Sequence, residues 1–422
     1  MGKNIKNLLI KKITEKKAVA GIVGVGYVGE SLGRAIAEAG FTTHGFEADE
    51  ARIRLLKDSL PVNFTLHCDK KLLNNCDIVC VCVPTPLTKE NLPNTSILEA
   101  AVDEVRQQLK KGQLIIIESS VAPGTTRNII LPILNKGGLR VGCDFFLAFS
   151  PERVDPGNSN YSVRNIPKVV GGIEDNSQRL GVVFYGSVVE KVVPVESCEA
   201  AELTKVLENV FRLINISLIN EIADYARALN INIWEVINAA ASKPFGFLAH
   251  YPGPGAGGYC IPVLPIYLLD SAKKNNISLP LVELATLSNR KQPEKIANMA
   301  LTIMNGKLHK STNGNGIKPQ ALLVGISYKE NLGDTRESVA LKIWNKLEEG
   351  GVEVHYHDPY VLRLNGFTSS DLNEEFLKKM DMIIVTTPHK NISYETLIAS
   401  KKPLLDTRGV LNNYTGANIY HL

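Results

Sequence analysis

Residues 18–29 read AVAGIVGVGYVG, an apolar run that ends in the pattern Gly24-x-Gly26-x-x-Gly29. The run predicts a buried β-strand, and residues Ser31–Ala39 after it have helical character. In a dinucleotide-binding unit the first glycine makes a tight turn, the second admits the pyrophosphate, and the third lets the helix pack on the strand. The stretch therefore predicts a Rossmann domain that binds phosphates at a helix N-terminus.

An acidic residue follows at the distance that such a domain requires. The next apolar run, Thr42–Phe46, stops at Glu47, 18 residues after Gly29. A carboxylate at this place accepts hydrogen bonds from the ribose hydroxyls and repels a 2′-phosphate. The predicted cofactor is therefore NAD rather than NADP.

Polar residues follow three further apolar runs. The runs are Asp77–Val83, Gln113–Glu118 and Phe145–Phe149. Thr85, Ser120 and Glu152 come soon after them, where an open parallel sheet has its ligand crevice. Each residue taken singly is also compatible with ordinary turn chemistry. The three together favour a cofactor or substrate site.

Composition narrows the classes of partner. The formal net charge is +4 and the charges are scattered, which favours a small anionic ligand over nucleic acid. No apolar run approaches the ~18 residues of a membrane span, and the first 20 residues lack the apolar core of a signal peptide. The seven cysteines show neither a disulfide framework nor a Cys/His metal cluster. We therefore expect reduced thiols in a cytoplasm, with no metal and no membrane partner.

A long helical segment follows the first domain. Residues 197–229 carry apolar side chains at helical spacing, which predicts one helix of roughly 50 Å. A helix of this length more often joins two domains than lies inside one. Lys205 and Asn209 are four residues apart and therefore share a face, either as part of a site or as a solvated stripe.

The next segment surrounds a single cysteine. Residues 251–267 read YPGPGAGGYCIPVLPIY, with four glycines before Cys260 and two prolines after it. Glycine lets the backbone approach a ligand, whereas proline stiffens the chain. The pattern suits a thiol nucleophile presented to a substrate. A buried structural cysteine is the alternative.

The C-terminal part predicts a second α/β domain after a polar linker at residues 305–319. Its predicted strands are Ala321–Ile326, Glu353–His357, Asp381–Thr386 and Pro403–Asp406. The domain lacks a GxGxxG pattern, so it holds something other than a dinucleotide. Lys329 and Arg336 lie on a charged loop and suit phosphate.

The predicted fold class is α/β. Two Rossmann-like domains are joined by a long central helix and a helical middle domain. The predicted boundaries are 1–195 for the NAD-binding domain, 196–310 for the central domain and 311–422 for the C-terminal domain.

A set of motifs carries a family resemblance over nearly the full length. They are GIVGVGYVG, CVPTP, ESSVAPGTT, SPERVDPGN, AAELTKVLENVFR, GPGAGGYCIP and GISYKENLGDTRES. In this order they resemble the UDP-glucose/GDP-mannose dehydrogenase family. The resemblance implies an NAD domain, a central helix that forms a homodimer interface, and a nucleotide-sugar domain. SPERVDPGN followed by NIPKVVGG looks most like the UDP-N-acetylglucosamine 6-dehydrogenases. UDP-N-acetylmannosamine and UDP-glucose dehydrogenases are the alternatives.

The family reaction oxidises the C6 alcohol of a UDP-sugar to a carboxylate with two NAD, for polysaccharide precursors. The resemblance implies that Cys260 adds to the aldehyde to form a thiohemiacetal, which becomes a thioester. Lys205 and Asn209 would stabilise the oxyanion, and Glu152 would activate water. Ser120 would hold a water or the C6 oxygen.

The resemblance also implies two sets of binding residues. The residues implied to contact NAD are Gly24, Gly26, Tyr27, Val28, Gly29, Glu47, Thr85, Pro86, Ser120 and Lys329. Those implied to contact the UDP-sugar are Glu152, Arg153, Val154, Lys205, Asn209, Arg212, Phe245, Phe247, Tyr251, Gly255, Gly257, Lys329 and Arg336.

One position departs from the family pattern Cys-x-Pro-x-Asp. Leu264 stands four residues after Cys260, where the family places an aspartate that takes part in proton transfer. Either Glu152 or Asp155 substitutes, or turnover is low, or the chain only binds its ligand. A hydroxyacid-type dehydrogenase, which would not need Cys260, is a further alternative. The NADH formed per sugar separates these readings as two, one or none.

Overall fold

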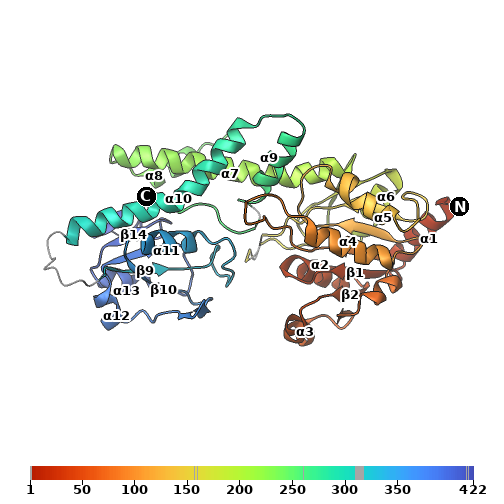
Figure 1. Cartoon of the computed structure of the whole chain (residues 1–422), viewed down its shortest axis with the longest axis horizontal. Helices are drawn as coiled ribbons and strands as arrows, with labels where there is room; N and C mark the ends of the chain where they lie inside the picture. The colour runs from red at the N-terminus through yellow and green to blue at the C-terminus, as the bar shows by residue number, and fades with distance from the viewer. Residues whose placement is uncertain are drawn as a thin grey trace. The chain divides into compact units, whose positions relative to one another are not determined.

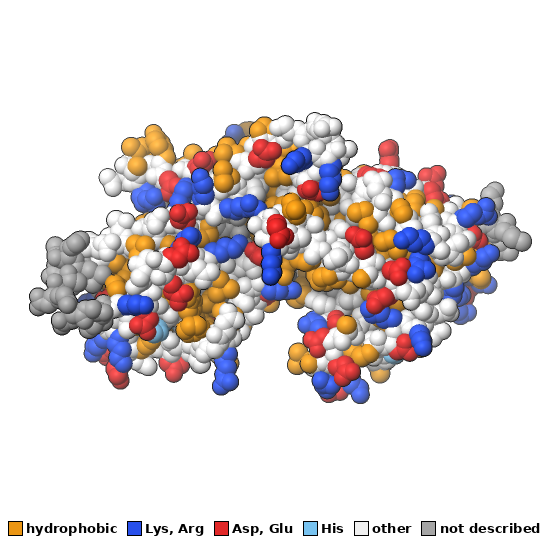
Figure 2. Space-filling view, viewed as in Figure 1, with side chains coloured by type: hydrophobic (Ala, Val, Ile, Leu, Met, Phe, Trp, Pro, Cys, Tyr) orange, Lys and Arg blue, Asp and Glu red, His pale blue; other side chains and the backbone are white. Residues whose placement is uncertain are grey.

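The computed structural model describes residues 2–155, 157–158, 160–259, 261–308, 318–414, 416 and 418–422. The chain forms two compact units (Figure 1). The first comprises Met1–Glu208 with Ile266–Ile277, and the second comprises Asn209–Pro265 with Ser278–Leu422. Within the described residues no helix combines the length and apolar character needed to cross a membrane. Basic and acidic side chains are interspersed over the face drawn in Figure 2, as the scattered charges of the sequence predict.

The first unit is built on an eight-stranded sheet in the order β3-β2-β1-β4-β5-β6-β7-β8. All neighbouring strands are parallel except β6 and β7. The strands are β1 Val19–Val23, β2 Thr42–Phe46, β3 Phe64–His67, β4 Ile78–Val81, β5 Leu114–Ile117, β6 Phe146–Phe149, β7 Lys168–Gly172 and β8 Val192–Val195.

Helices cover both faces of this sheet. One face packs against α1 (Gly2–Thr14), α2 (Tyr27–Glu38) and α6 (Asp175–Tyr185). The other face packs against α4 (Ser96–Gln107) and α5 (Leu131–Asn135). The strands are therefore buried on both sides, which explains why they are continuous apolar runs in the sequence. The smaller α3 (Glu50–Leu56) and most of α9 (Leu264–Lys274) complete the unit.

The second unit holds a five-stranded parallel sheet in the order β10-β9-β13-β14-β15. Its strands are β9 Gln320–Val324, β10 Glu353–His357, β13 Met382–Val385, β14 Leu404–Asp406 and β15 Ile419–His421, and a short hairpin joins β11 Arg363–Leu364 to β12 Phe367–Thr368. Its helices are α8 Ile233–Ala241, α10 Pro280–Leu308, α11 Val339–Glu349, α12 Glu374–Lys379 and α13 Tyr394–Ala399. Residues of α10 and α11 cover one face of the sheet, and residues of α12 and α13 cover the other.

Most predicted elements are confirmed, and the differences have physical causes. The long helix is α7, Cys198–Ala228, which contributes residues to both units. The prediction of a linker from residue 305 was wrong in part, because α10 continues to Leu308 despite its polar end. Residues 309–317 of that linker lie outside the described residues. Strands β3, β7, β8 and β15 were not predicted, because β3, β7 and β15 carry polar or charged residues and β8 is four residues long and contains a proline.

A buried carboxylate attaches α7 to the first unit. Glu202 accepts hydrogen bonds from the backbone N–H of Gly124 at 2.6 Å and of Thr126 at 2.8 Å. The Thr126 hydroxyl donates to the same carboxylate at 2.6 Å. Burial raises the pKa of Glu202 from 4.5 to about 7, although these hydrogen bonds oppose the rise. Glu202 therefore orients the loop after β5, where Ser120 lies.

The raised pKa of Glu202 predicts a pH-dependent stability. Between about pH 4.5 and 7 the folded chain retains a proton that the unfolded chain has lost, so stability falls as pH rises. We expect Glu202→Gln to remove on the order of 3 kcal/mol of this fall in the free energy of unfolding. Denaturant titrations of both proteins at several pH values measure the difference.

Glu199 supplies the matched control on the same helix. The Arg127 guanidinium lowers the pKa of Glu199, so Glu199→Gln should not reduce the fall between about pH 5 and 7. Identical pH profiles for Glu202→Gln and the unmodified chain would contradict the assignment.

Candidate functional site

The glycine turn after β1 has the geometry of a dinucleotide cradle. Gly24 has φ +86°, and a Cβ on Gly29 would lie 2.0 Å from the Gly24 carbonyl oxygen. The backbone geometry of this turn therefore requires glycine at both positions, whether or not a ligand is bound. A Cβ on Gly26 would meet nothing within 4 Å. The space beside Gly26 and the uncapped N-terminus of α2 fit the pyrophosphate of NAD.

Glu47 is fixed beside this turn. Its carboxylate accepts hydrogen bonds from the backbone N–H of Val25 at 2.9 Å, of Ala48 at 2.8 Å and of Asp49 at 3.1 Å. The carboxylate at the end of β2 is therefore held within one residue of Gly24 and Gly26. This is the position from which the sequence analysis predicted contact with the ribose.

The loops after β4 and β5 meet, as predicted. The Thr85 hydroxyl donates to the Ser120 carbonyl oxygen at 2.7 Å. Sequence reasoning did not find Tyr267, whose hydroxyl lies 3.0 Å from the Pro86 carbonyl oxygen and 3.1 Å from the Asn94 backbone nitrogen. Burial raises the pKa of Tyr267 to about 12, so its hydroxyl remains protonated. Through Tyr267, α9 fixes the loop that carries Thr85 and Pro86.

Glu152, after β6, is buried and held from two sides. One carboxylate oxygen accepts from the backbone N–H of Arg153 at 2.7 Å and of Val154 at 2.6 Å. The other lies 3.4 Å from the Lys168 ammonium. The Arg153 guanidinium pairs with Glu208 of α7 at 2.6 Å, which ties this loop to the central helix.

The sequence analysis also missed Lys168, whose ammonium contacts a second buried carboxylate. Its ammonium lies 2.5 Å from Glu118, and the Tyr185 hydroxyl donates to the same carboxyl group. Two carboxylates around one ammonium raise the pKa of Lys168 and keep it charged, against the effect of its burial. Burial raises the pKa of Glu118 to about 7. The signal in the sequence is a lysine that opens an otherwise apolar strand, KVVGG.

The predicted polar face of α7 contains a buried donor. Lys205 and Asn209 are one turn apart, and the Asn209 residue is 4% exposed. Among the residues that the structure describes, Nδ2 of Asn209 has no hydrogen-bond partner. Leaving a buried donor unpaired costs about 1–3 kcal/mol, so a ligand oxygen would satisfy a real deficit here.

Three amide side chains in the second unit hold the glycine-rich loop. Asn220 accepts from the Gly253 N–H at 2.9 Å, and Gln292 donates to the Gly253 carbonyl at 3.0 Å. Asn289 accepts from the Ala256 N–H at 2.7 Å and donates to its carbonyl at 3.2 Å. Cys260 lies outside the described residues.

The predicted aromatic contacts to the nucleotide lie largely at the surface of this unit. Phe245 and Phe247 are 69% and 42% exposed, and Arg212 is exposed as well. Tyr251 stacks on Trp234 with ring centroids 5.1 Å apart.

The second sheet presents cations at its carboxyl edge. Lys329 lies on the loop after β9. Arg336 forms a fork with Asp334, with its closest contact at 2.6 Å, and its guanidinium lies 4.8 Å from the centre of the Tyr259 ring. A phosphate would therefore compete with Asp334 for Arg336. Arg408, not predicted, donates to the Thr386 carbonyl at 2.9 Å and has a guanidinium nitrogen 3.1 Å from a Cβ position on Gly253.

Within the described residues no group of His, Cys, Asp and Glu side chains could hold a metal ion.

Comparison with known proteins agrees with this geometry. The NAD binding domain of the UDP-glucose/GDP-mannose dehydrogenase family matches residues 59–189, its central domain matches 199–291 and its UDP binding domain matches 322–413. A UDP-N-acetyl-D-mannosamine dehydrogenase of Methanococcus aeolicus is 31% identical over 93% of this chain and 91% of its own.

The chain belongs to the UDP-glucose/GDP-mannose dehydrogenase family. A UDP-N-acetyl-D-glucosamine 6-dehydrogenase of Pseudomonas aeruginosa is 31% identical over 81% of this chain and 82% of its own. The solved UDP-N-acetylmannosamine dehydrogenase of Pyrococcus horikoshii superposes with a TM-score of 0.85 at 28% identity, covering 96% of this chain and 98% of that chain. The resemblance and the fold class predicted from the sequence are confirmed. The chain is an NAD-dependent oxidoreductase of UDP-sugars.

Glu47 generates a prediction about cofactor choice. The carboxylate would face a 2′-phosphate at close range, and like charges so placed cost several kcal/mol. We expect Glu47→Ser with Ala48→Arg to lower the ratio of kcat/KM for NAD over NADP by at least about tenfold. Steady-state kinetics with both cofactors measure the ratio.

Glu50→Ser is the control, because Glu50 is an exposed acid on the adjacent α3. This variant should leave the preference unchanged. Equal kcat/KM for NAD and NADP in the unmodified chain would refute the role of Glu47.

Proposed function

We propose that this dehydrogenase oxidises the C6 hydroxymethyl group of a UDP-N-acetylhexosamine to the uronic acid, a four-electron reaction that uses two NAD. The observation that carries the proposal is the polar face of α7, where the buried Asn209 amide has an unpaired donor one turn from Lys205. Such donors suit an oxygen that becomes negatively charged in the transition state. The family's NAD binding domain matches residues of the first unit and its UDP binding domain matches residues of the second, so each unit supplies the site for one ligand.

The covalent part of the reaction is assigned to Cys260. NAD, when bound, would supply the hydride acceptor for the oxidation of C6. The first oxidation gives an aldehyde, and the Cys260 thiol adds to it with formation of an S–C6 bond and transfer of the thiol proton. The thiohemiacetal loses a second hydride and its hydroxyl proton to become a thioester. Water then attacks C6, the S–C6 bond breaks, and the carboxylate and the thiol are released.

The described side chains fit the remaining roles. Lys205 and Asn209 would stabilise the oxygen at C6, and Ser120 would hold a water or that oxygen. Glu152 would activate the hydrolytic water. Its contacts with Arg153 N–H, Val154 N–H and Lys168 hold the carboxylate in one orientation, which supports this role.

Two observations bear on the sugar. The motif SPERVDPGN followed by NIPKVVGG favours UDP-N-acetylglucosamine. The Methanococcus aeolicus and Pyrococcus horikoshii relatives are named for UDP-N-acetylmannosamine, which favours its epimer. Both sugars carry an acetamido group, so we propose this class. NADH production with a panel of UDP-sugars would decide between them.

The central helix also offers an interface. Six large apolar residues of α7 are exposed: Leu203, Leu207, Phe211, Leu218, Ile222 and Tyr225. Their spacing of three, four or seven residues places them in one stripe. We propose that a second copy of the chain covers this stripe in a homodimer. A cytoplasmic location and a role in polysaccharide precursor synthesis complete the proposal.

The covalent step is tested by removing the thiol. We expect Cys260→Ala to abolish acid formation while NAD and UDP-sugar binding persist, because alanine offers no nucleophile. In Glu152→Gln, where hydrolysis should be slow, intact-protein mass spectrometry should show a sugar adduct at Cys260. Cys143→Ala is the control, since Cys143 is a free and exposed thiol. Full uronate production by Cys260→Ala would rule out covalent catalysis.

Leu264 generates a separate prediction. It is the first residue of α9 and 1% exposed, and a carboxylate there would gain from the helix dipole. Positioned acid–base groups contribute about 10²–10⁴-fold, so Leu264→Asp should raise kcat by at least about tenfold with little change in substrate Kd. Stopped-assay kcat values and thermal midpoints of both proteins measure the effect.

Val263→Asp is the matched control, because Val263 is the adjacent buried residue at 4% exposure. It should lower both kcat and Tm, since the chain has no use for a carboxylate there. A drop in both for Leu264→Asp as well would show that leucine belongs to a rearranged working site.

A further inference from the structure

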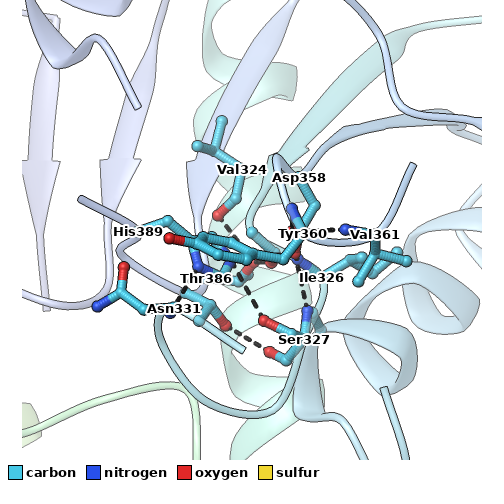
Figure 3. A network of polar contacts seen from close by, with 12 residues as sticks. Val324, Ile326, Ser327, Asn331, Asp358, Tyr360, Val361, Thr386 and His389 are labelled. Carbon is cyan, nitrogen blue, oxygen red and sulfur yellow. Dashed lines mark hydrogen bonds and ion pairs between the residues drawn. The ribbon is translucent and has the colours of Figure 1, made fainter. Parts of the chain in front are cut away.

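A buried polar network holds the loop of residues 326–331 (Figure 3). It follows β9, which lies between β10 and β13 in the second sheet. After β9 the chain forms β10 on one side of β9, and the next strand of the sheet, β13, lies on the other side. The direction in which strands are added to the sheet therefore reverses at β9. Ligands of open parallel sheets bind at such a reversal, outside the carboxyl ends of the strands.

Asp358 follows β10 and is fully buried. One carboxylate oxygen accepts from the backbone N–H of Ile326 at 2.7 Å and of Ser327 at 3.1 Å. The other accepts from Tyr360 at 2.8 Å and Val361 at 3.1 Å. Asp358 thus joins the start of the loop after β9 to the turn after β10.

His389 follows β13 and fixes the other end of the same loop. Its Nδ1 accepts from the Asn331 backbone N–H at 2.9 Å, which requires the proton of the neutral ring to be on Nε2. That proton is donated to Asp358, 3.0 Å away. Asn331 has φ +58°, and its side-chain oxygen accepts from the Lys390 N–H at 2.9 Å.

Ser327 connects His389 to Lys329. Its hydroxyl donates to the Lys329 carbonyl oxygen at 2.9 Å and lies 3.2 Å from Nε2 of His389. This is no nucleophile triad, because Asp358 and Ser327 share one ring nitrogen whereas a triad uses both. The contacts instead fix the backbone conformation of the residue that would contact phosphate.

We propose that Asp358 and His389 are positioning residues that hold the loop 326–331, and with it Lys329, in the conformation that binds the diphosphate of the nucleotide sugar. The inference rests on the proposed function, which places UDP in this unit. Ordering one residue costs about 1–2 kcal/mol, so a loop held in advance binds more tightly than a loose one. The network joins the loops after β9, β10 and β13, and each of its polar groups has a hydrogen-bond partner. A fully paired network of this kind is rigid, which suits it to holding the loop in one conformation.

The test uses the full chain with UDP and NAD as separate probes in titration calorimetry. We expect Asp358→Asn and His389→Phe each to weaken UDP binding at least tenfold, while NAD affinity stays within twofold. Asp381→Asn is the matched control, because Asp381 accepts from the Gln320 N–H at 2.8 Å at the opposite end of β9. It should lower Tm without changing UDP affinity.

Ser327→Ala is the milder variant, which removes one hydroxyl from the same loop. It should weaken UDP binding about fivefold, as expected for one hydrogen bond. A lowered Tm with unchanged UDP affinity in Asp358→Asn and Ser327→Ala would overturn the proposal, and so would an equal loss of NAD affinity. An unmodified chain that binds NAD but not UDP would refute the proposed function itself, and this inference with it.

Discussion

Within each unit of this enzyme, carboxylates at the ends of strands accept backbone N–H groups and so order the loops that are proposed to bind ligands. Where a strand ends, its loop has N–H groups without a partner in the sheet, and each would be costly if buried unpaired. Glu47, Glu152 and Asp358 each follow a strand, Asp406 is the last residue of β14, and each of the four accepts two or more such groups. Glu202 does the same from α7. The loops are therefore ordered before any ligand arrives, and binding need not order them.

The negative charge of these buried carboxylates is compensated in different ways in the two units. In the first unit Lys168 lies between Glu118 and Glu152, so a fully buried ammonium offsets two acids. In the second unit Asp358 has a neutral histidine and four backbone donors, which lower its pKa despite burial. The first arrangement fixes the Glu152 carboxylate beside a lysine that stays charged. The second joins the loops after β9, β10 and β13 through one buried carboxylate.

Local patterns explain how much of this could be predicted from the sequence. The glycine turn and Glu47 were found because one βαβ unit contains them and each glycine has a steric reason. Thr85 and Ser120 were found because parallel strands end at one edge. Lys168 could not be assigned a role, because its partners are Glu118, the residue after β5, and Glu152, in the loop after β6. The antiparallel pairing of β7 with β6 brings Lys168 to them. Tyr267 contacts residues more than 170 positions away, which no local pattern records.

In the proposed mechanism one site oxidises C6 twice without releasing the aldehyde, because the Cys260 thiol retains it. The most direct measurement is the number of NADH molecules formed for each UDP-N-acetylglucosamine or UDP-N-acetylmannosamine consumed, followed to completion. We expect two for the sugar that is the substrate. A value of one would describe a simple alcohol dehydrogenase and would contradict this mechanism, and a value of zero for a bound sugar would leave only a binding protein.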